Sequence, residues 1–381
     1  MRKVKVGFIG CGHISEIYLK NCTETFDILE VVAVADVFPE MARKRAEQFG
    51  IANVFTVDEL LADPEVEIVV NLTSPQAHTE VNMKILEAGK HVYTEKPFAL
   101  SLEDADRVLA LAKEKGLMVG SAPDTFLGGQ LQTSRKIIDD GWIGTVYAAS
   151  GSILMGPAWN DMHPNIHSFM DFGWDPLFDM APYWLTAMVH LLGPARRVSG
   201  SIGQVHKELH VKNMKSPHYG QTIPVTAPMN VTAIIDFESG PTAHLLAAKE
   251  SFGYAPKMEV YGTEGILSIQ DPNFFGGTVK VSLSNGEEKE FPYSHGYLED
   301  SRGLGIADMA TAIVTVRPHR ASGELARHVL DISHAILESS KTDRHVLVTA
   351  PCKQPTPLPL GLKYNQLDQS TTRHLSAFRS D

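Results

Sequence analysis

The sequence predicts an α/β protein with two domains, the first built on a parallel sheet and the second on a mainly antiparallel sheet. Strand-like and helical segments alternate up to about residue 122, as is typical of right-handed βαβ units. Strand-like segments separated by turn residues then replace the alternation. The length of 381 residues also favours two domains, since one domain usually takes roughly 150 residues.

The first domain is predicted to contain five strands and the helices between them. The strand segments are nearly unbroken runs of apolar residues, which suits a sheet covered on both faces. They are 3–10, 30–36, 66–72, 90–96 and 116–121. The helical segments carry apolar residues at three- and four-residue spacing. They are 13–24, 39–49, 76–88 and 101–115.

The second domain is predicted to start with a helix, a strand, a long polar and aromatic loop and another helix. These segments are 130–144, 145–154, 155–176 and 177–194. Turn residues then separate the strands of a mainly antiparallel sheet. These strands are 196–205, 229–237, 242–250, 257–262, 265–270 and 278–283. Two helices within 303–340 follow, and we expect the proline-rich arm, 350–381, to cross the surface or contact another subunit.

The composition is that of a globular protein, with 43% hydrophobic and 21% charged residues. A net charge of −11 argues against nucleic-acid and anionic-membrane partners. The three cysteines are too few and scattered for a disulfide framework. The apolar part of the first ten residues is too short for a signal peptide, and no apolar run reaches the ~18 residues of a membrane span. We therefore expect a cytoplasmic protein.

The segment GCGHIS, residues 10–15, joins the first strand to the first helix. Gly10 allows a tight turn, and Gly12 lets a pyrophosphate approach the backbone, where amide groups at the helix start hold its charge. Ser15 takes the place of the third small residue of a dinucleotide-binding loop. We expect Gly10, Gly12, His13 and Ile14 to contact a dinucleotide, the alternative being a tight turn without a ligand.

Asp36 ends the second strand, at the distance along the chain where a carboxylate binds the ribose 2′-hydroxyl of such a cofactor. No basic residue follows until Arg43, so the 2′-phosphate of NADP would meet an uncompensated negative charge. The sequence therefore favours NAD over NADP.

Two further strands of the parallel sheet end in polar residues, and ligands bind beyond these carboxyl ends. We expect Thr73, Pro75 and His78 to lie near the cofactor, although Thr73 could cap a helix and His78 could be a packed histidine. The other strand ends in Glu95 and Lys96, followed by Pro97. Lys96 is either a solvated strand end or a functional cation facing the cofactor.

The segments GFIGCGHIS, VVAVAD, VNLTSPQAHTE and AGKHVYTEKPFALS, in this order, resemble the glucose–fructose oxidoreductase, inositol dehydrogenase and MocA family. The resemblance implies an N-terminal Rossmann domain, 1–122, and a C-terminal α+β domain, 123–381, with a large open sheet. It also implies that Lys96 points at the reacting hydroxyl and that Glu95 lies at the nicotinamide end of the cofactor. Because an open sheet face suits self-association, we expect a homodimer or homotetramer.

Asp179 and Tyr183 are four residues apart, so one helix would present them on the same face. The segment is similar to a family signature in which a histidine, the acid–base catalyst, follows an aspartate by four residues. Tyr183 stands in the place of that histidine. A tyrosine is a weak base near neutral pH unless a cation such as Lys96 lowers its pKa. The alternative is that Tyr183 is a core aromatic and Asp179 a helix cap.

Further polar residues are candidates for binding the substrate. In the long loop we expect Trp159, His163 and His167 to line the site. The two histidines have the four-residue spacing of a metal pair, but Pro164 between them and the lack of a third ligand argue against a metal. Arg320, in the connector between the last two helices, could reach the cleft or cap a helix.

The sequence thus predicts an NAD-dependent dehydrogenase that acts on a sugar, such as a pyranose, or on a cyclitol. Lys96, Asp179 and Tyr183 are its predicted catalytic residues. Hydride loss from a secondary alcohol also requires loss of the hydroxyl proton, and an ammonium group stabilises the developing alkoxide. Two alternatives are a glycosidase of the same fold that keeps its NAD bound and a sensor that binds NAD without turnover.

Overall fold

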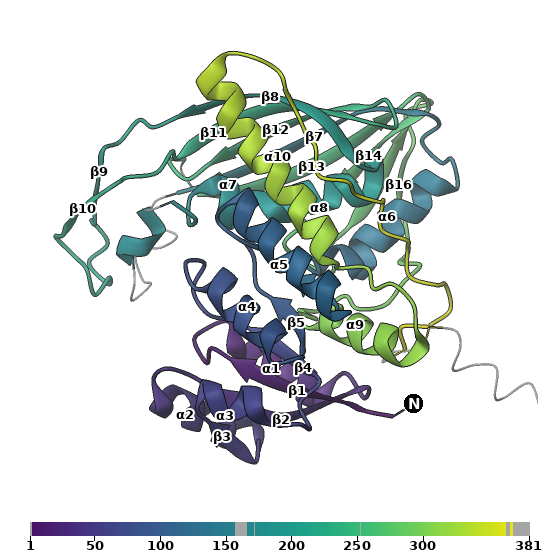
Figure 1. Cartoon of the computed structure of the whole chain (residues 1–381). Helices are drawn as coiled ribbons and strands as arrows, with labels where there is room; N and C mark the ends of the chain where they lie inside the picture. Colours follow the sequence, from purple (N-terminus) through teal and green to yellow (C-terminus); the bar gives the residue numbers. More distant parts are fainter. Residues whose placement is uncertain (1, 157–165, 171, 252, 363–365, 369–381) are drawn as a thin grey trace, which may run out of the picture.

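A computed structural model describes residues 2–156, 166–170, 172–251, 253–362 and 366–368 (Figure 1). The N-terminal part of the described chain forms a parallel sheet of six strands in the order β3-β2-β1-β4-β5-β6. The strands are β1 (Val4–Ile9), β2 (Leu29–Ala35), β3 (Asn53–Phe55), β4 (Ile68–Asn71), β5 (His91–Thr94) and β6 (Val119–Ser121). This order reverses direction between β1 and β4, and ligands bind in the crevice at such a switch point.

Helices flank the first sheet, and the four predicted helices are present, one with the predicted bounds and three with shifted ends. They are α1 (Ser15–Glu24), α2 (Pro39–Phe49), α3 (Val57–Ala62), α4 (His78–Glu87) and α5 (Leu102–Lys115). Two of the observed elements, β3 and α3, were not predicted. A strand of three residues shows no periodicity, but α3 begins with a capping box between Thr56 and Glu59, a pattern visible in the sequence.

The described part of the second domain contains a sheet of nine strands in the order β16-β15-β14-β13-β7-β12-β11-β8-β17. Neighbouring strands are antiparallel except β7 and β12, which run parallel. The strands are β7 (Val146–Met155), β8 (Ala195–Gly203), β11 (Asn230–Phe237), β12 (Thr242–Ala248), β13 (Tyr254–Gly262), β14 (Gly265–Ile269), β15 (Val279–Leu283), β16 (Glu288–Glu290) and β17 (Val346–Leu347). The predicted mainly antiparallel sheet is therefore confirmed.

Helices cover the face of this sheet that is turned toward the first domain (Figure 1). They are α6 (Gly129–Asp139), α8 (Ala181–Leu192) and α10 (Gly323–Thr342), with the short α7 (Pro176–Asp179) before α8. Another helix, α9 (Leu304–Thr315), packs against β6 of the first sheet. Burial alternates along β11, so side chains on its other face reach solvent within the described chain. The large sheet is thus open on one side.

The predicted helix 177–194 is two helices, α7 and α8, with a break at Met180. Pro182 causes this break, because it has no backbone N–H to donate to the carbonyl of Phe178. Asp179 therefore ends α7 while Tyr183 lies in the first turn of α8. Their proximity depends on this bend rather than on one continuous helix.

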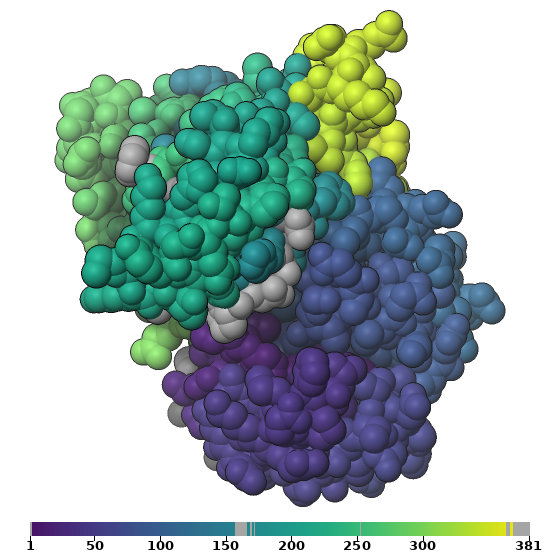
Figure 2. Space-filling view, turned by 90° about the vertical axis from the view of Figure 1, so that its left-hand side faces the viewer, coloured from purple at the N-terminus to yellow at the C-terminus, as the bar shows by residue number. Residues whose placement is uncertain are grey.

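A small β-hairpin of β9 (Glu208–His210) and β10 (Thr222–Pro224) projects from the second domain (Figure 1). It has an apolar cluster of its own, which includes Ile166 and Met170 of the 3₁₀ helix η3 (Ile166–Met170). In Figure 2 this teal region and the purple and blue first domain lie on either side of the boundary between the domains. The described part of the C-terminal arm packs on its own chain, where Leu358 N donates to Gln132.

Candidate active site

The glycine loop has the geometry that a pyrophosphate requires. Gly10 has φ of +99°, and a Cβ there would lie 2.6 Å from the backbone of Leu72, so only glycine fits. At Gly12 no atom lies within 4 Å of the place a Cβ would take, which leaves room for a phosphate above the backbone. The N-terminus of α1 follows directly, and its amide groups favour an anion.

Arg45 of α2 fixes this loop by hydrogen bonds. The side chain is buried and donates to Gly12 O at 3.2 Å and to Ser15 Oγ at 3.1 Å. The Ser15 hydroxyl donates in turn to Gly12 O at 2.6 Å. Arg45 also binds Glu16 and Gln48. Because these contacts occupy its guanidinium, Arg45 serves the loop and is not free to bind a second phosphate.

Asp36 lies at the end of β2, half-buried beside the glycine loop. Its Oδ2 accepts from Cys11 N at 2.6 Å and its Oδ1 from Phe38 N at 2.8 Å. These bonds hold the carboxylate at the end of the second strand, where this fold carries a ribose-binding acid. Beside it, Phe38 is 62% exposed.

The ends of β4 and β5 are tied together by His78, at the start of α4. Its ring nitrogens lie 2.7 Å from Pro97 O and 3.1 Å from Thr73 O. The imidazole is fully buried, and burial lowers its pKa despite those two carbonyl groups. His78 is therefore the packed histidine of the two alternatives, and it positions Thr73 and Pro97 instead of facing a cofactor. Pro75, beside Thr73, is buried as well.

Lys96 lies at the centre of the site, in the turn after β5, and Asp179 reaches it from the second domain. The Lys96 Nζ donates to Asp179 Oδ1 at 2.7 Å and to Asp179 O at 2.9 Å. The side chains are 14% and 11% exposed, so little water screens the pair. Lys249, which follows β12, donates to Asp179 Oδ2 at 2.7 Å and is 3% exposed. One carboxylate thus binds two ammonium groups.

The charges of this cluster determine its protonation. Burial favours the neutral form of Asp179, but Lys249 and Lys96 outweigh burial and hold the pKa of its carboxyl well below the usual range. Burial likewise opposes the charge of Lys96, yet the anion of Asp179 raises its pKa above the ordinary lysine value. Both groups are therefore ionised across the physiological pH range.

Tyr183 packs against this cluster, with the Lys96 Nζ 5.6 Å from the centroid of its ring. Arg302, in the segment before α9, is a second cation near the phenol. Burial raises the pKa of Tyr183, and the opposing effects of Lys96 and Arg302 do not cancel that increase. Lys96 thus lowers this pKa in the direction we expected, but the net pKa is above the normal value. At neutral pH the group is a protonated phenol.

Glu95 is buried beside α1, which carries Tyr18. Its Oε1 accepts from the Tyr18 hydroxyl at 2.7 Å, and its Oε2 accepts from Lys96 N at 2.9 Å. These bonds orient the backbone from which Lys96 projects. Glu95 therefore acts in this structure as a support for Lys96.

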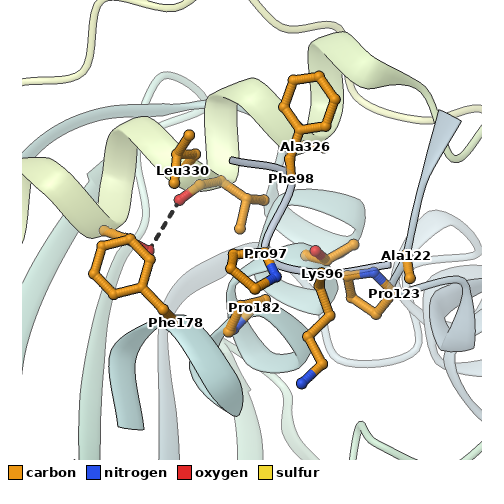
Figure 3. A pocket seen from close by; sticks show the side chains of 12 residues that line it. Lys96, Pro97, Phe98, Ala122, Pro123, Phe178, Pro182, Ala326 and Leu330 are labelled. Carbon is orange, nitrogen blue, oxygen red and sulfur yellow. Dashed lines mark hydrogen bonds between the residues drawn. The ribbon is translucent and has the colours of Figure 1, made fainter. Parts of the chain in front are cut away.

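Behind Lys96 lies a pocket with mainly apolar walls, formed by the turn after β5, α8 and α10 (Figure 3). Pro97, Phe98, Phe178 and Leu330 line it, while the Lys96 Nζ points away from these side chains (Figure 3). The side chains that line the pocket thus pack against the turn after β5 and support it. The ammonium group faces the opposite side, where Asp179 and Tyr183 lie.

Among the described residues, the other two predicted to bind the substrate, Arg320 and His167, form no hydrogen bond with this cluster. Arg320 binds Asp308 at 2.6 Å and the carbonyl groups of Thr356 and Pro357, so its guanidinium holds the C-terminal arm. This geometry corrects our expectation that Arg320 reaches the cleft. His167 is exposed, with its ring 6.2 Å from that of His218. Two of the predicted residues, Trp159 and His163, lie outside the described residues.

The remaining loop residues differ in exposure: His13 is exposed and Ile14 is half-buried. Within the described ranges, no group of three or more His, Cys, Asp or Glu side chains is placed to bind a metal. No helix among these residues is long and apolar enough to cross a membrane.

Two residues of this cluster, Lys249 and Arg302, were not predicted from the sequence. Lys249 is 70 residues from Asp179 in the sequence, and the two meet because α7, which ends at Asp179, packs against β11 and β12. Arg302 resembles any charged loop residue, and no motif marks it. Arg45 was not predicted either, although a basic residue on α2 facing the glycine loop is a usable signal once the first two βα units are recognised.

Comparison with known proteins agrees with this geometry. Residues 4–122 match the model of an oxidoreductase family with an NAD-binding Rossmann fold, and residues 131–268 match the GFO/IDH/MocA C-terminal domain. A dTDP-3,4-didehydro-2,6-dideoxy-alpha-D-glucose 3-reductase of Streptomyces violaceoruber is 32% identical over 317 residues, 82% of this chain and 86% of the reductase. The chain belongs to the Gfo/Idh/MocA family of oxidoreductases. Its first domain is an NAD-binding Rossmann domain.

Two further similar proteins share a smaller fraction of identical residues with this chain. A myo-inositol 2-dehydrogenase of Thermotoga maritima is 23% identical over 349 residues, covering 90% of this chain and 98% of that enzyme. The solved structure of a levoglucosan dehydrogenase in complex with NADH and L-sorbose has a TM-score of 0.80 at 20% identity, covering 92% of this chain and all of that one. This likeness shows a shared fold.

Proposed function

We propose that this member of the family is an NAD-dependent dehydrogenase or reductase that interconverts a secondary hydroxyl and a carbonyl group on a sugar, such as a pyranose, or on a cyclitol. The observation that carries the proposal is the Lys96 ammonium, bound to Asp179 and lying over the ring of Tyr183 at the carboxyl end of β5. The relatives named for inositol and for a dTDP-linked sugar support this substrate class.

The cofactor would be held by residues whose geometry fits it. Gly10 and Gly12 would accommodate the pyrophosphate, Asp36 would bind the ribose diol, and Thr73 would lie beside the cofactor at the end of β4. When bound, NAD supplies the acceptor or the donor of the hydride. Preference for NAD over NADP follows from the anionic Asp36 and from the engagement of Arg45 with the glycine loop.

The roles of the catalytic side chains follow from their charges. Lys96 stabilises negative charge that develops on the substrate oxygen, and Asp179 keeps Lys96 protonated and oriented. Tyr183 exchanges the proton of the substrate hydroxyl, with Arg302 beside it. Because burial raises the pKa of Tyr183, its phenol is a proton donor at neutral pH, which suits carbonyl reduction. Alcohol oxidation requires the phenolate and is favoured at higher pH.

The second domain, 123–381, would supply Asp179 and Tyr183, bind the substrate and mediate assembly, while residues 1–122 bind the cofactor.

The open face of the large sheet supports a homodimer or homotetramer. Ile234 is 50% exposed and Ile266 is 37% exposed on this face, where a second copy would bury both. Light scattering should show a multimer, and Ile234→Glu should dissociate it. A monomeric parent protein would contradict the proposed assembly.

The decisive experiment for the function is a substrate screen. NADH absorbance is followed in both directions with pyranoses, aldonic lactones, inositols and their keto forms. At least one compound should change the absorbance. If NAD instead remains bound through gel filtration and glycosides are hydrolysed without net NADH formation, the glycosidase alternative replaces the dehydrogenase. If no compound reacts although NAD binds, a sensor replaces it.

A further inference from the structure

Lys249 is a second buried cation at the site, and three hydrogen bonds fix its position. Its Nζ donates to Asp179 Oδ2 at 2.7 Å and to the carbonyl of Trp174, just before α7. Its backbone N–H donates to Met229 O at 2.9 Å, which fixes the chain as it leaves β12. The side chain is 3% exposed, so it does not serve solubility. A buried lysine is costly unless paired, and its partner is the aspartate that also binds Lys96.

The two lysines bind opposite oxygens of this carboxylate, and their arrangement has an electrostatic consequence. If Lys96 and Asp179 formed an isolated pair, the aspartate would cancel the charge that Lys96 presents to the substrate oxygen. With Lys249 on the far oxygen, two ammonium groups share one carboxylate, and these three side chains together carry one net positive charge. That charge remains available to stabilise an anionic oxygen in a site with little water.

We propose that Lys249 is a positioning residue of the active site, which holds the Asp179 carboxylate from behind and preserves positive charge on the Lys96 side. This inference rests on the proposed function, because the anion that benefits is the substrate oxygen or the phenolate of Tyr183. Lys249 acts through Asp179 and does not itself contact the substrate. It also connects the end of β12 to the segment before α7, so the carboxylate is fixed from two separate segments of the chain.

Loss of Lys249 should change the pH dependence of the reaction through its effect on Tyr183. Without Lys249, Lys96 alone compensates the negative charge of Asp179. Less positive charge then remains to stabilise the phenolate of Tyr183. The pKa of Tyr183 should then rise, by roughly one unit for loss of one nearby unit charge. The groups that face the phenol or the carboxylate are Lys96 and Glu95 after β5, Asp179 at the end of α7, Arg302 before α9, Tyr254 on β13 and Lys249 after β12.

The test compares Lys249→Met and Lys249→Arg with Lys90→Met. Lys90 is a matched control, because it is also buried and binds two carbonyl groups, Asp63 O and Val66 O at 2.6 and 2.9 Å, in the first domain. For alcohol oxidation, the acid limb of the kcat/KM profile should move to higher pH by about one unit in Lys249→Met. Lys249→Arg should restore the parent pH profile. Lys90→Met should be less stable than the parent, but its pH profile should stay the same.

A second measurement needs no turnover and separates this inference from the proposed function. The ultraviolet difference between each protein and its Tyr183→Phe counterpart, recorded with NAD bound, reports ionisation of Tyr183. Its midpoint should be higher in Lys249→Met even if no sugar is ever turned over. An unchanged midpoint, or a Lys249→Met protein that differs from the parent only in stability as Lys90→Met does, would overturn the role of Lys249.

Discussion

The shared carboxylate makes a strong prediction for Asp179→Asn. The substitution preserves shape but leaves two buried ammonium groups, 14% and 3% exposed, without their anion. A buried ion pair broken on one side costs about 3–5 kcal/mol. Here one change removes the partner of two cations, so we expect the upper part of that range, about 5 kcal/mol at pH 7. The same change should abolish most turnover, since Lys96 loses its orientation.

The cost should depend on pH in a defined direction. In the parent, Asp179 has a depressed pKa, so its contribution to stability is present above the unfolded carboxyl pKa and is lost as pH falls through the folded one. In the variant, burial without the anion lowers the pKa of Lys96. As pH rises through that lowered value, Lys96 becomes neutral and the difference from the parent shrinks.

Urea-induced unfolding at pH 7 and at pH 9.5–10 measures this difference, with fluorescence of the buried Trp184 as the signal for the second domain. Asp140→Asn is the control, because Asp140 is 41% exposed and pairs with Lys136, which is 35% exposed, and such surface pairs contribute about 0–1 kcal/mol. If Asp179→Asn costs no more than Asp140→Asn, or costs the same at both pH values, Asp179 does not hold two buried charges.

Three further predictions concern the cofactor, Lys96 and pH. Asp36→Ala should weaken NAD and narrow its advantage over NADP in fluorescence titrations; equal affinity for the two cofactors in the parent would contradict the role of Asp36. Lys96→Ala should leave NAD binding nearly intact while removing most turnover, because its stabilisation belongs to the transition state; a loss confined to NAD affinity would make Lys96 a cofactor anchor. Oxidation should accelerate with rising pH and reduction should slow, because burial raises the pKa of Tyr183; oxidation that is fastest below neutral pH would exclude a phenolate base.

Local sequence patterns predicted the features that depend on neighbouring residues. The glycine loop, Asp36 and the turn at Lys96 each follow a strand directly, and the parallel order of these strands places their ends together. The bend at Met180 was also open to local reasoning, because Pro182 cannot complete the helix.

The residues that were not predicted depend on long-range packing. Lys249 meets Asp179 because α7 packs against β12 of the large sheet, and packing between segments so far apart in the chain cannot be inferred from one sequence. Arg302 reaches Tyr183 from an irregular segment whose path is fixed by Asn21, which donates to Arg302 O at 2.8 Å. The net pKa of Tyr183 was equally inaccessible, since it depends on how deeply α8 is buried.

The central claim is that Tyr183 exchanges the substrate proton beside Lys96, and Tyr183→Phe tests it most directly. The change keeps the ring against Lys96 and removes only the hydroxyl. With the best substrate from the screen, single-turnover NADH absorbance should show a rate lower by roughly 10² to 10⁴, as for loss of a general acid–base group, while NAD affinity stays at the parent value. A rate within a few-fold of the parent would contradict the account and place the proton transfer on another group.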